Sequence, residues 1–189
     1  MAAKTPGDQP SKPSLIVYAC PVGPLAKQLE AYLDESRQLC GENTAHAYMP
    51  HCTLTGFFTD EESAIPHYVQ TLEKVWHQYA QEMTSLHVEI RQVLFRPNWH
   101  GLALEAEGLK RLVEAFAQQA DSPTRTEAIR LKDWLHLSLA YDFPLADAPA
   151  LQQMATKMIE ISTPVAWELR FYQRTPNNQW TCHWSRALG

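Results

Sequence analysis

Glycine, cysteine and long hydrophobic runs are all scarce in this sequence. Seven glycines in 189 residues leave little scope for a glycine-rich loop that cradles phosphates. The four cysteines are scattered and form no CxxC pair, so we expect reduced, mostly buried thiols and no disulfide scaffold. No apolar run approaches the roughly 20 residues that a membrane-spanning helix needs. We therefore predict no membrane partner.

Basic tracts and a secretory signal are also missing. The formal net charge is −5, whereas tight binding to long nucleic acids needs a basic surface, so long duplexes are excluded as partners. Residues 1–13 lack an apolar core behind Lys4 and Lys12, and their proline, glycine and polar content predicts a disordered leader. We expect a cytoplasmic monomer in which residues 14–189 form one domain.

Hydrophobic periodicity and turn residues divide the rest of the chain into strands and helices. Strands are predicted over residues 14–20, around His51, over 86–95 and 101–105, around His136, and over 165–174 and 179–185. Helices are predicted over 24–40, from Asp60 as N-cap to about Met83, over 109–116 and over 147–161. This order fits an α+β fold better than a doubly wound parallel sheet.

The same series of elements occurs twice. Strand, helix, histidine strand and helix recur in the same order, and His136 follows His51 by 85 positions. At this spacing Ile16 falls on Gly101, Leu25 on Lys110 and Glu62 on Asp147. This is the pattern of an internal duplication. Two similar lobes facing each other would bring the two histidine strands together at a pseudo-twofold centre.

Two short motifs, His51-Cys52-Thr53 and His136-Leu137-Ser138, occupy matching places in the two halves. Residues two apart in a strand share a face, so each motif presents one imidazole beside one hydroxyl. A neutral imidazole can take a proton from an attacking water, while a protonated one gives a proton to a departing alkoxide. Hydroxyls can hold the non-bridging oxygens of a phosphodiester. This chemistry requires no metal ion.

Other interpretations of the histidines are weaker. A third match, His183-Trp184-Ser185, breaks the 85-residue spacing, and we expect it at the end of the last strand. No HxxxH or HExxH lies on a predicted helix, and the remaining histidines show no ligand spacing with cysteines or carboxylates. A serine hydrolase is not indicated either, because the GxSxG elbow is absent. No metal and no cofactor are predicted.

The paired H-x-[ST] motifs of the two halves resemble the 2H phosphoesterase superfamily. The segments YACPVGPLAKQLEAYLDESRQLCGENTAHAYMPHCTLTGFF and LHLSLAYDF are similar to the phosphoesterase domain of the TULA/Sts (ubiquitin-associated and SH3-domain-containing) proteins. The resemblance implies a bilobal, duplicated α+β fold, with two antiparallel sheets facing a central cleft and helices outside. It also implies that His51 and His136 are catalytic and that Thr53 and Ser138 bind the phosphate.

The resemblance further implies metal-independent hydrolysis of 2′,3′-cyclic nucleotides to nucleoside monophosphates. We expect a small nucleotide or a short RNA end as substrate. By analogy, His136 activates water and His51 protonates the leaving oxygen, while Tyr141 packs rather than stacks on a base. Two alternatives stay open: a 2′-5′ phosphodiesterase or RNA-end processing enzyme, and a non-catalytic phosphate-binding scaffold.

Overall fold

The structure, a computed structural model, describes residues 12–82 and 86–188. The leader predicted over residues 1–13 therefore falls almost entirely outside the described residues. Within the part of the chain that is described, no helix is both long enough and apolar enough to cross a bilayer.

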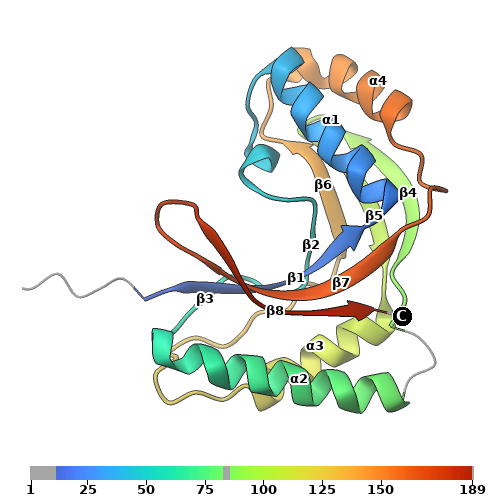
Figure 1. Cartoon of the computed structure of the whole chain (residues 1–189). Coiled ribbons are helices and arrows are strands. Elements are labelled where there is room, and N and C mark those ends of the chain that lie inside the picture. Colours follow the sequence, from blue (N-terminus) through green and yellow to red (C-terminus); the bar gives the residue numbers. More distant parts are fainter. Residues whose placement is uncertain (1–11, 83–85, 189) are drawn as a thin grey trace, which may run out of the picture.

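The fold class is α+β, as predicted (Figure 1). The strands are Ser14–Val22 (β1), Cys52–Thr53 (β2), Phe58–Thr59 (β3), Glu89–Arg96 (β4), Trp99–Glu105 (β5), His136–Tyr141 (β6), Ala166–Arg174 (β7) and Trp180–Leu188 (β8). The α-helices are Pro24–Cys40 (α1), Ile65–Glu82 (α2), Glu107–Gln119 (α3) and Ala148–Met158 (α4). Short 3-10 turns cover Thr44–Ala47 (η1), Glu62–Ala64 (η2) and Leu145–Asp147 (η3).

The strands form one antiparallel sheet in which two wings meet at a narrow junction. The strand order is β4-β5-β6-β2-β1-β7-β8, and β3 pairs with β1 outside this path. One wing is β4-β5-β6 and the other is β1-β7-β8, and β2 joins them. Because β2 has only two residues, it meets β6 at a single residue pair, Cys52 with Leu137. The two predicted sheets are thus continuous through this one pair.

The helices follow the predicted duplication. The helix α1 packs against α4, and α2 packs against α3, at opposite ends of the molecule (Figure 1). In the duplicated halves α1 corresponds to α3, and α2 corresponds to α4. Exchanging the halves therefore converts one helix pair into the other, which is the relation expected of a pseudo-twofold axis.

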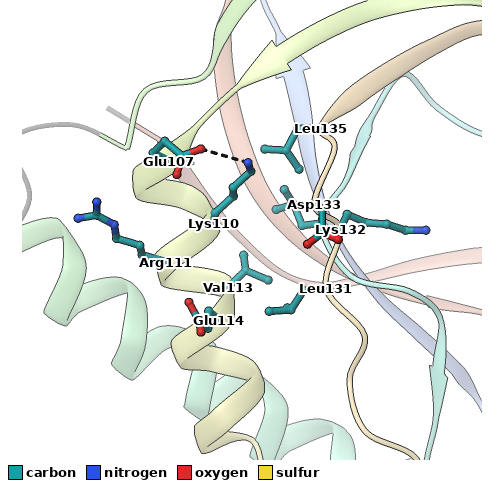
Figure 2. A pocket seen from close by; sticks show the side chains of 10 residues that line it. Glu107, Lys110, Arg111, Val113, Glu114, Leu131, Lys132, Asp133 and Leu135 are labelled. Atoms are coloured by element: carbon teal, nitrogen blue, oxygen red, sulfur yellow. Dashed lines mark hydrogen bonds and ion pairs between the residues drawn. The ribbon is translucent and has the colours of Figure 1, made fainter.

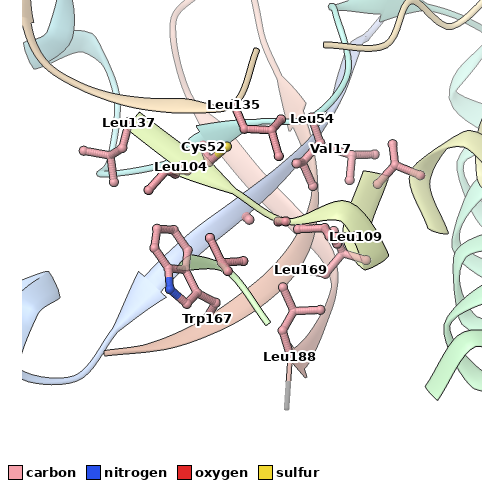
Figure 3. Packing of buried hydrophobic residues seen from close by; sticks show 14 of the residues in the cluster. Val17, Cys52, Leu54, Leu104, Leu109, Leu135, Leu137, Trp167, Leu169 and Leu188 are labelled. Atoms are coloured by element: carbon pink, nitrogen blue, oxygen red, sulfur yellow. The ribbon is translucent and has the colours of Figure 1, made fainter. Parts of the chain in front are cut away.

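The central strand β1 is buried on both faces and separates the main core from the site. Alternate residues of a strand point to opposite faces. One face packs into the main core through Leu15, Val17 and Ala19, and the other contributes Ile16, Tyr18 and Cys20 to a smaller cluster. Figure 3 shows the main core, where side chains from both wings meet Leu109 of α3. Because β2 pairs with β1 and buries Cys52 in the main core, the side chains of the residues on either side of Cys52 must point outward.

Asp60 does not cap a helix, contrary to the prediction. The turn η2 intervenes before α2, and Asp60 is fully buried. Its carboxylate accepts hydrogen bonds from Tyr68 Oη and Thr124 Oγ1, each at 2.6 Å. Asp60 thus connects α2 to the loop that follows α3. The predicted helix end, Met83, lies outside the described residues.

Candidate active site

The two H-x-[ST] motifs lie side by side on β2 and β6. Cys52 pairs with Leu137 in antiparallel register, and both side chains are buried in the core. Continued by one residue in each direction, this register sets each histidine opposite the hydroxyl of the other motif: His51 opposite Ser138, and His136 opposite Thr53. All four side chains therefore share the outer face. The two histidines are diagonal neighbours, about 7–8 Å apart, a separation that a phosphate group can span.

His51 is held by its own backbone and by two tyrosine rings. Its Nδ1 lies 2.8 Å from the carbonyl oxygen of Met49, so Nδ1–H donates and Nε2 is left free to accept a proton. The ring centroid lies 4.0 Å from that of Tyr18 and 5.3 Å from that of Tyr48. Together with Thr53, the ring lines a pocket of about 260 Å³. His51 is thus oriented with its reactive nitrogen free.

His136 repeats this arrangement in the second half. Its Nδ1 lies 3.3 Å from the carbonyl oxygen of Trp134, again two residues earlier in the chain. The Trp134 ring stacks on the imidazole, with centroids 4.2 Å apart, and is itself 43% exposed. The same local hydrogen bond therefore sets the tautomer of both histidines.

A tryptophan positions the Ser138 hydroxyl. Trp99 Nε1–H donates to Ser138 Oγ at 2.9 Å. Because Ser138 acts here as an acceptor, its own O–H remains available to donate to a phosphate oxygen. The Trp99 ring lies across Gly101, where an added Cβ would fall 2.4 Å from Trp99 Cζ2. Neither Trp99 nor Gly101 belongs to a recognisable motif, so their role could not be predicted from the sequence.

Burial lowers the pKa of both imidazoles. For His51, burial is the main cause, and the charge of His136 has a smaller effect in the same direction. The hydrogen bond to the Met49 carbonyl raises the pKa, but the net result is a pKa of about 4. Burial also lowers the pKa of His136, helped by the positive charges of Lys132 and Arg96. Burial therefore favours the neutral form of both rings in the unliganded protein, and the negative charge of a bound phosphate would favour the protonated form that a general acid needs.

A bulge in β6 brings Tyr141 to the site. Gly101 pairs with Ser138 and His100 with Ala140, which leaves Leu139 as an extra residue. A bulge reverses the alternation of side chains beyond it. Tyr141 therefore lines the pocket with His51, whereas strict alternation would have turned it to the core. Burial, together with the neighbouring Tyr48 and Asp142, raises its pKa to about 12, so its phenol stays protonated.

A hairpin in each wing carries an arginine paired with a tryptophan at one end of the site. Arg96 pairs with Trp99 across β4 and β5, and Arg174 pairs with Trp180 across β7 and β8. Arg96 Cζ lies 4.9 Å from the ring centroid of Trp134, and Arg174 Cζ lies 5.4 Å from that of Trp180. Aromatic rings thus flank both ends of the site. The two arginine–tryptophan pairs cannot be recognised in the sequence, because the two residues are separated by different numbers of positions in the two hairpins.

Two cations that sequence analysis missed also line the His51 pocket. Arg130 and Lys132 reach it from the loop before β6. The only signal in the sequence was their alternation, R130-L131-K132, just upstream of the second motif.

His183, the third match, is not among the residues that line this pocket. Its Nε2 lies 2.8 Å from Gln173 Oε1 on the neighbouring strand, and its nearest ring neighbour is Phe171 of the core. The third match thus lies in the middle of β8, not at its end as expected, and outside this pocket.

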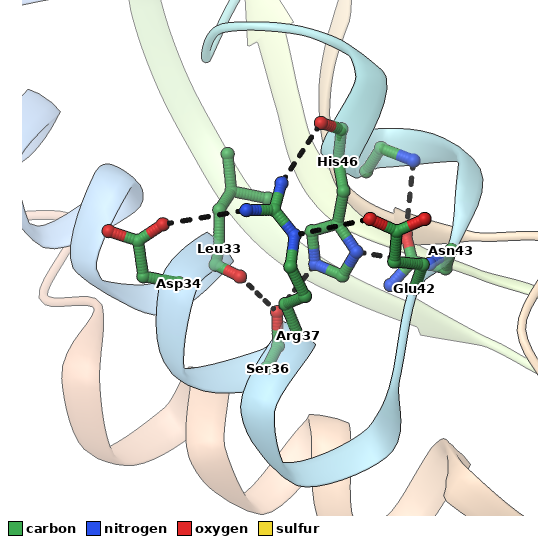
Figure 4. A network of polar contacts seen from close by, with 8 residues as sticks. Leu33, Asp34, Ser36, Arg37, Glu42, Asn43 and His46 are labelled. Carbon is green, nitrogen blue, oxygen red and sulfur yellow. Dashed lines mark hydrogen bonds and ion pairs between the residues drawn. The ribbon is translucent and has the colours of Figure 1, made fainter.

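A serine–histidine contact elsewhere has a structural role (Figure 4). Ser36 Oγ donates to the carbonyl oxygen of Leu33 at 3.1 Å and lies 3.0 Å from His46 Nε2. The Asn43 backbone N–H donates to His46 Nδ1 at 3.0 Å. Because both ring nitrogens and the hydroxyl proton are engaged, this pair offers no free base or nucleophile. It fixes the turn η1, whose C-cap residue, Tyr48, lies beside His51.

Metal-ligating side chains do not gather in the described part of the chain. There, no three histidine, cysteine, aspartate or glutamate side chains come close enough together to hold one ion. The site consists of imidazoles, hydroxyls and cations.

The chain is similar to several known proteins, although no family model matches it. Human ubiquitin-associated and SH3 domain-containing protein B is 30% identical over 171 residues, which are 88% of this chain and 26% of that protein. Ecdysteroid-phosphate phosphatase of Drosophila melanogaster is 30% identical over 201 residues, which cover 85% of this chain and 26% of that protein. The chain spans about a quarter of the length of these relatives. The resemblance seen in the sequence is therefore confirmed.

One similar solved structure is E. coli LigT complexed with phosphate. It matches with a TM-score of 0.47 and 15% identity, over 94% of this chain and 98% of LigT.

Proposed function

Because the chain belongs to the family of the ubiquitin-associated and SH3 domain-containing proteins and carries two paired H-x-[ST] motifs, we propose that it is a 2H phosphoesterase that acts as a metal-independent phosphodiesterase. Its substrates in this proposal are 2′,3′-cyclic nucleotides, which it opens to nucleoside monophosphates. The observation that carries the proposal is the interlocked register at Cys52 and Leu137, which sets two imidazoles and two hydroxyls on one face.

The reaction consumes one water molecule. One neutral imidazole takes a proton from the water whose oxygen attacks phosphorus. The bond between phosphorus and one ribose oxygen breaks, and the second imidazole, protonated at the start, gives its proton to that oxygen. Thr53 and Ser138 donate hydrogen bonds to the non-bridging oxygens, where negative charge must be held. At the end the two rings have exchanged protonation states, and solvent resets them.

The two histidines are not equivalent as base and acid. The base works in its neutral form, so the ring with the more strongly lowered pKa suits that role. Burial lowers the pKa of His51 to about 4, which favours His51 as base and leaves His136 as acid. This is the reverse of the assignment expected by analogy, and the dependence of kcat/KM on pH in His51→Ala and His136→Ala tests it.

An exposed aromatic surface supports a nucleotide as substrate. Nucleobases stack on aromatic rings, at about 1–3 kcal/mol per base. The Trp134 ring lies on His136 and is 43% exposed, so one face of the site already carries such a platform.

The proposal is tested by assaying the purified protein with the four 2′,3′-cyclic mononucleotides, with and without EDTA. A 2′-5′ oligoadenylate and a phosphate monoester complete the panel, the latter because one relative is named a phosphatase. We expect turnover of the cyclic nucleotides that EDTA does not abolish. Turnover of the oligoadenylate alone would favour the 2′-5′ alternative, and binding without turnover of any substrate would favour a scaffold.

Variants identify the groups that act. His51→Ala and His136→Ala should each lower turnover at least about 10²-fold, because each removes one proton transfer. Smaller losses in turnover are expected for Thr53→Ala and Ser138→Ala. His183→Ala is the matched control, since it removes a histidine in the same type of motif outside the pocket. An equal loss in the control would contradict the assignment.

A further inference from the structure

A strand-like segment before β6 extends the site beyond the two motifs. The Gly56 N–H donates to the carbonyl oxygen of Arg130 at 2.7 Å, and the Lys132 N–H donates to that of Leu54 at 3.1 Å. Leu131 forms an isolated bridge with Thr55 between these bonds. Because side chains alternate along an extended chain, Arg130 and Lys132 share one face and Leu131 takes the other.

The segment lies between two hollows. Leu131 and Lys132 both line a groove of about 460 Å³ along α3, although the Lys132 side chain extends away from that helix (Figure 2). Arg130 and Lys132 both line the pocket that contains His51 and Thr53. The two cations are therefore directed to the catalytic side of the molecule.

Arg130 lies across Gly56. A Cβ added to Gly56 would fall 3.3 Å from both Nε and Nη2 of Arg130. Glycine thus leaves room for the guanidinium close to the backbone at this position. A side chain there would force the guanidinium to shift by a few tenths of an ångström.

Neither cation is neutralised by the protein. In the described part of the chain, no side-chain hydrogen bond or ion pair joins Arg130 or Lys132 to another group, and both are exposed. By contrast, Arg174 at the other hairpin donates to Asn178 Oδ1 at 2.6 Å and to Tyr48 Oη at 3.2 Å. Two unpaired positive charges beside one pocket are a notable local excess in a chain of net charge −5.

A cyclic mononucleotide brings only one phosphate, which the two motifs already hold. We infer that Arg130 and Lys132 bind a second phosphate of the substrate, so that the preferred substrates are 2′,3′-cyclic nucleotides that carry a further phosphate group. This inference rests on the proposed function. The second phosphate can be a terminal 5′-monoester or the internal phosphodiester of a short RNA, which both offer anionic oxygens to a guanidinium and an ammonium.

The experiment compares kcat/KM for three substrates. They are adenosine 2′,3′-cyclic phosphate, its 5′-phosphorylated form and the dinucleotide ApA with a 2′,3′-cyclic end. We expect at least one of the two-phosphate substrates to be preferred about tenfold over the mononucleotide, because a hydrogen bond to a charged group contributes about that much. Which of the two is preferred distinguishes a monoester from an internal diester.

Variants then test whether the two cations cause this preference. The ratio of kcat/KM between the preferred substrate and the mononucleotide should fall toward one in Arg130→Gln and in Lys132→Gln, because both cations are needed to hold the second phosphate. Arg111→Gln on α3 and Lys157→Gln on α4 are the matched controls, since each removes the same charge outside the His51 pocket. Their ratios should stay at the wild-type value.

A binding measurement separates this inference from the proposed function. Calorimetry with adenosine 2′,5′-bisphosphate and adenosine 2′-monophosphate needs no turnover. The bisphosphate should bind about tenfold tighter, and Arg130→Gln should remove the difference. Turnover of the mononucleotide with a wild-type ratio near one would overturn the inference and leave the proposed function standing. An equal loss of kcat/KM for all three substrates in Arg130→Gln would also overturn it, because the guanidinium would then act on the scissile phosphate.

Discussion

His51 and His136 titrate below the usual range of histidine because burial disfavours their charged forms. The profile of kcat/KM against pH reports the essential acid and base of the free enzyme. With both pKa values lowered, we expect a bell centred below pH 6.5. Activity falls on the acidic side as the base gains its proton, with a limb near pH 4, and falls on the alkaline side as the acid loses its proton.

The measurement is kcat/KM for a 2′,3′-cyclic nucleotide between about pH 3.5 and 8, a range over which this phosphodiester stays a monoanion. With His51 as base, the residual activity of His51→Ala should lack the acidic limb, and that of His136→Ala the alkaline one. Loss of the opposite limbs would restore the assignment by analogy. A bell centred above pH 7 would show that burial does not control these groups.

At the same scale, Trp99 should act through Ser138. Trp99→Phe removes the indole N–H that holds Ser138 Oγ at 2.9 Å but keeps an aromatic ring. We expect kcat to fall several-fold while the thermal midpoint changes little, because the ring still packs. In a Ser138→Ala background the same change should cost nothing further, and an additive loss in this double-mutant cycle would contradict the positioning role.

Among the elements, the loop after α3 depends on Asp60. Burial opposes ionisation of Asp60, but hydrogen bonds from Ser122, Thr124 and Tyr68 outweigh it and lower its pKa to about 2. The lowered pKa corresponds to about 2 kcal/mol of stability, present above the unfolded pKa near 4 and lost as the pH falls through about 2. Asp60 therefore anchors the chain that later carries the two pocket cations.

Asp60→Asn should lower the free energy of unfolding by about 2 kcal/mol at pH 7. Urea denaturation at pH 7 and pH 3 measures this loss. It should shrink at pH 3, because the Asp60 carboxyl of the unfolded chain, with a pKa near 4, is then largely protonated while the native one is still ionised. Glu61→Gln is the control, since Glu61 only forms a surface ion pair with Lys12. An equal effect at both pH values would show that charge is not involved.

Most element bounds followed from local signals. Pro24 and Gly41 mark the ends of α1, which begins and ends where predicted. The strand around His51 is shorter than expected, because Leu54 and Thr55 both donate to the carbonyl oxygen of Val17 and thereby interrupt regular pairing. Such an irregularity, like the bulge at Leu139, depends on the partner strand and has no signature in the sequence of one strand.

For the molecule as a whole, we expect the two halves to unfold together. The helix pairs α1 with α4 and α2 with α3 each combine one helix from either half, and β2 pairs with β6 across the junction. Neither half can therefore keep its core alone. Thermal unfolding followed by circular dichroism and by calorimetry should give a single coincident transition, and two resolved transitions would contradict the prediction of one domain.

The candidate site was predictable in its centre and not in its surroundings. His51, Thr53, His136 and Ser138 were found from alternation and from their matching places in two halves, both of which are properties of the chain itself. Their neighbours come from other hairpins and loops. Trp99 reaches Ser138 over Gly101, and Arg130 reaches the pocket over Gly56, and these approaches exist only once the strands have paired.

Each histidine faces a hydroxyl that comes from the other half of the chain, so neither half contains a complete site. A half-length ancestor with one H-x-[ST] motif would have held a complete set of groups only where two copies met, with the motif of each copy beside its partner's. The contact between Cys52 and Leu137 would then have lain on the twofold axis of a homodimer. In that case the face shared by the two motifs would correspond to the subunit interface of the ancestor, and gene fusion would have freed its two halves to diverge into a base and an acid.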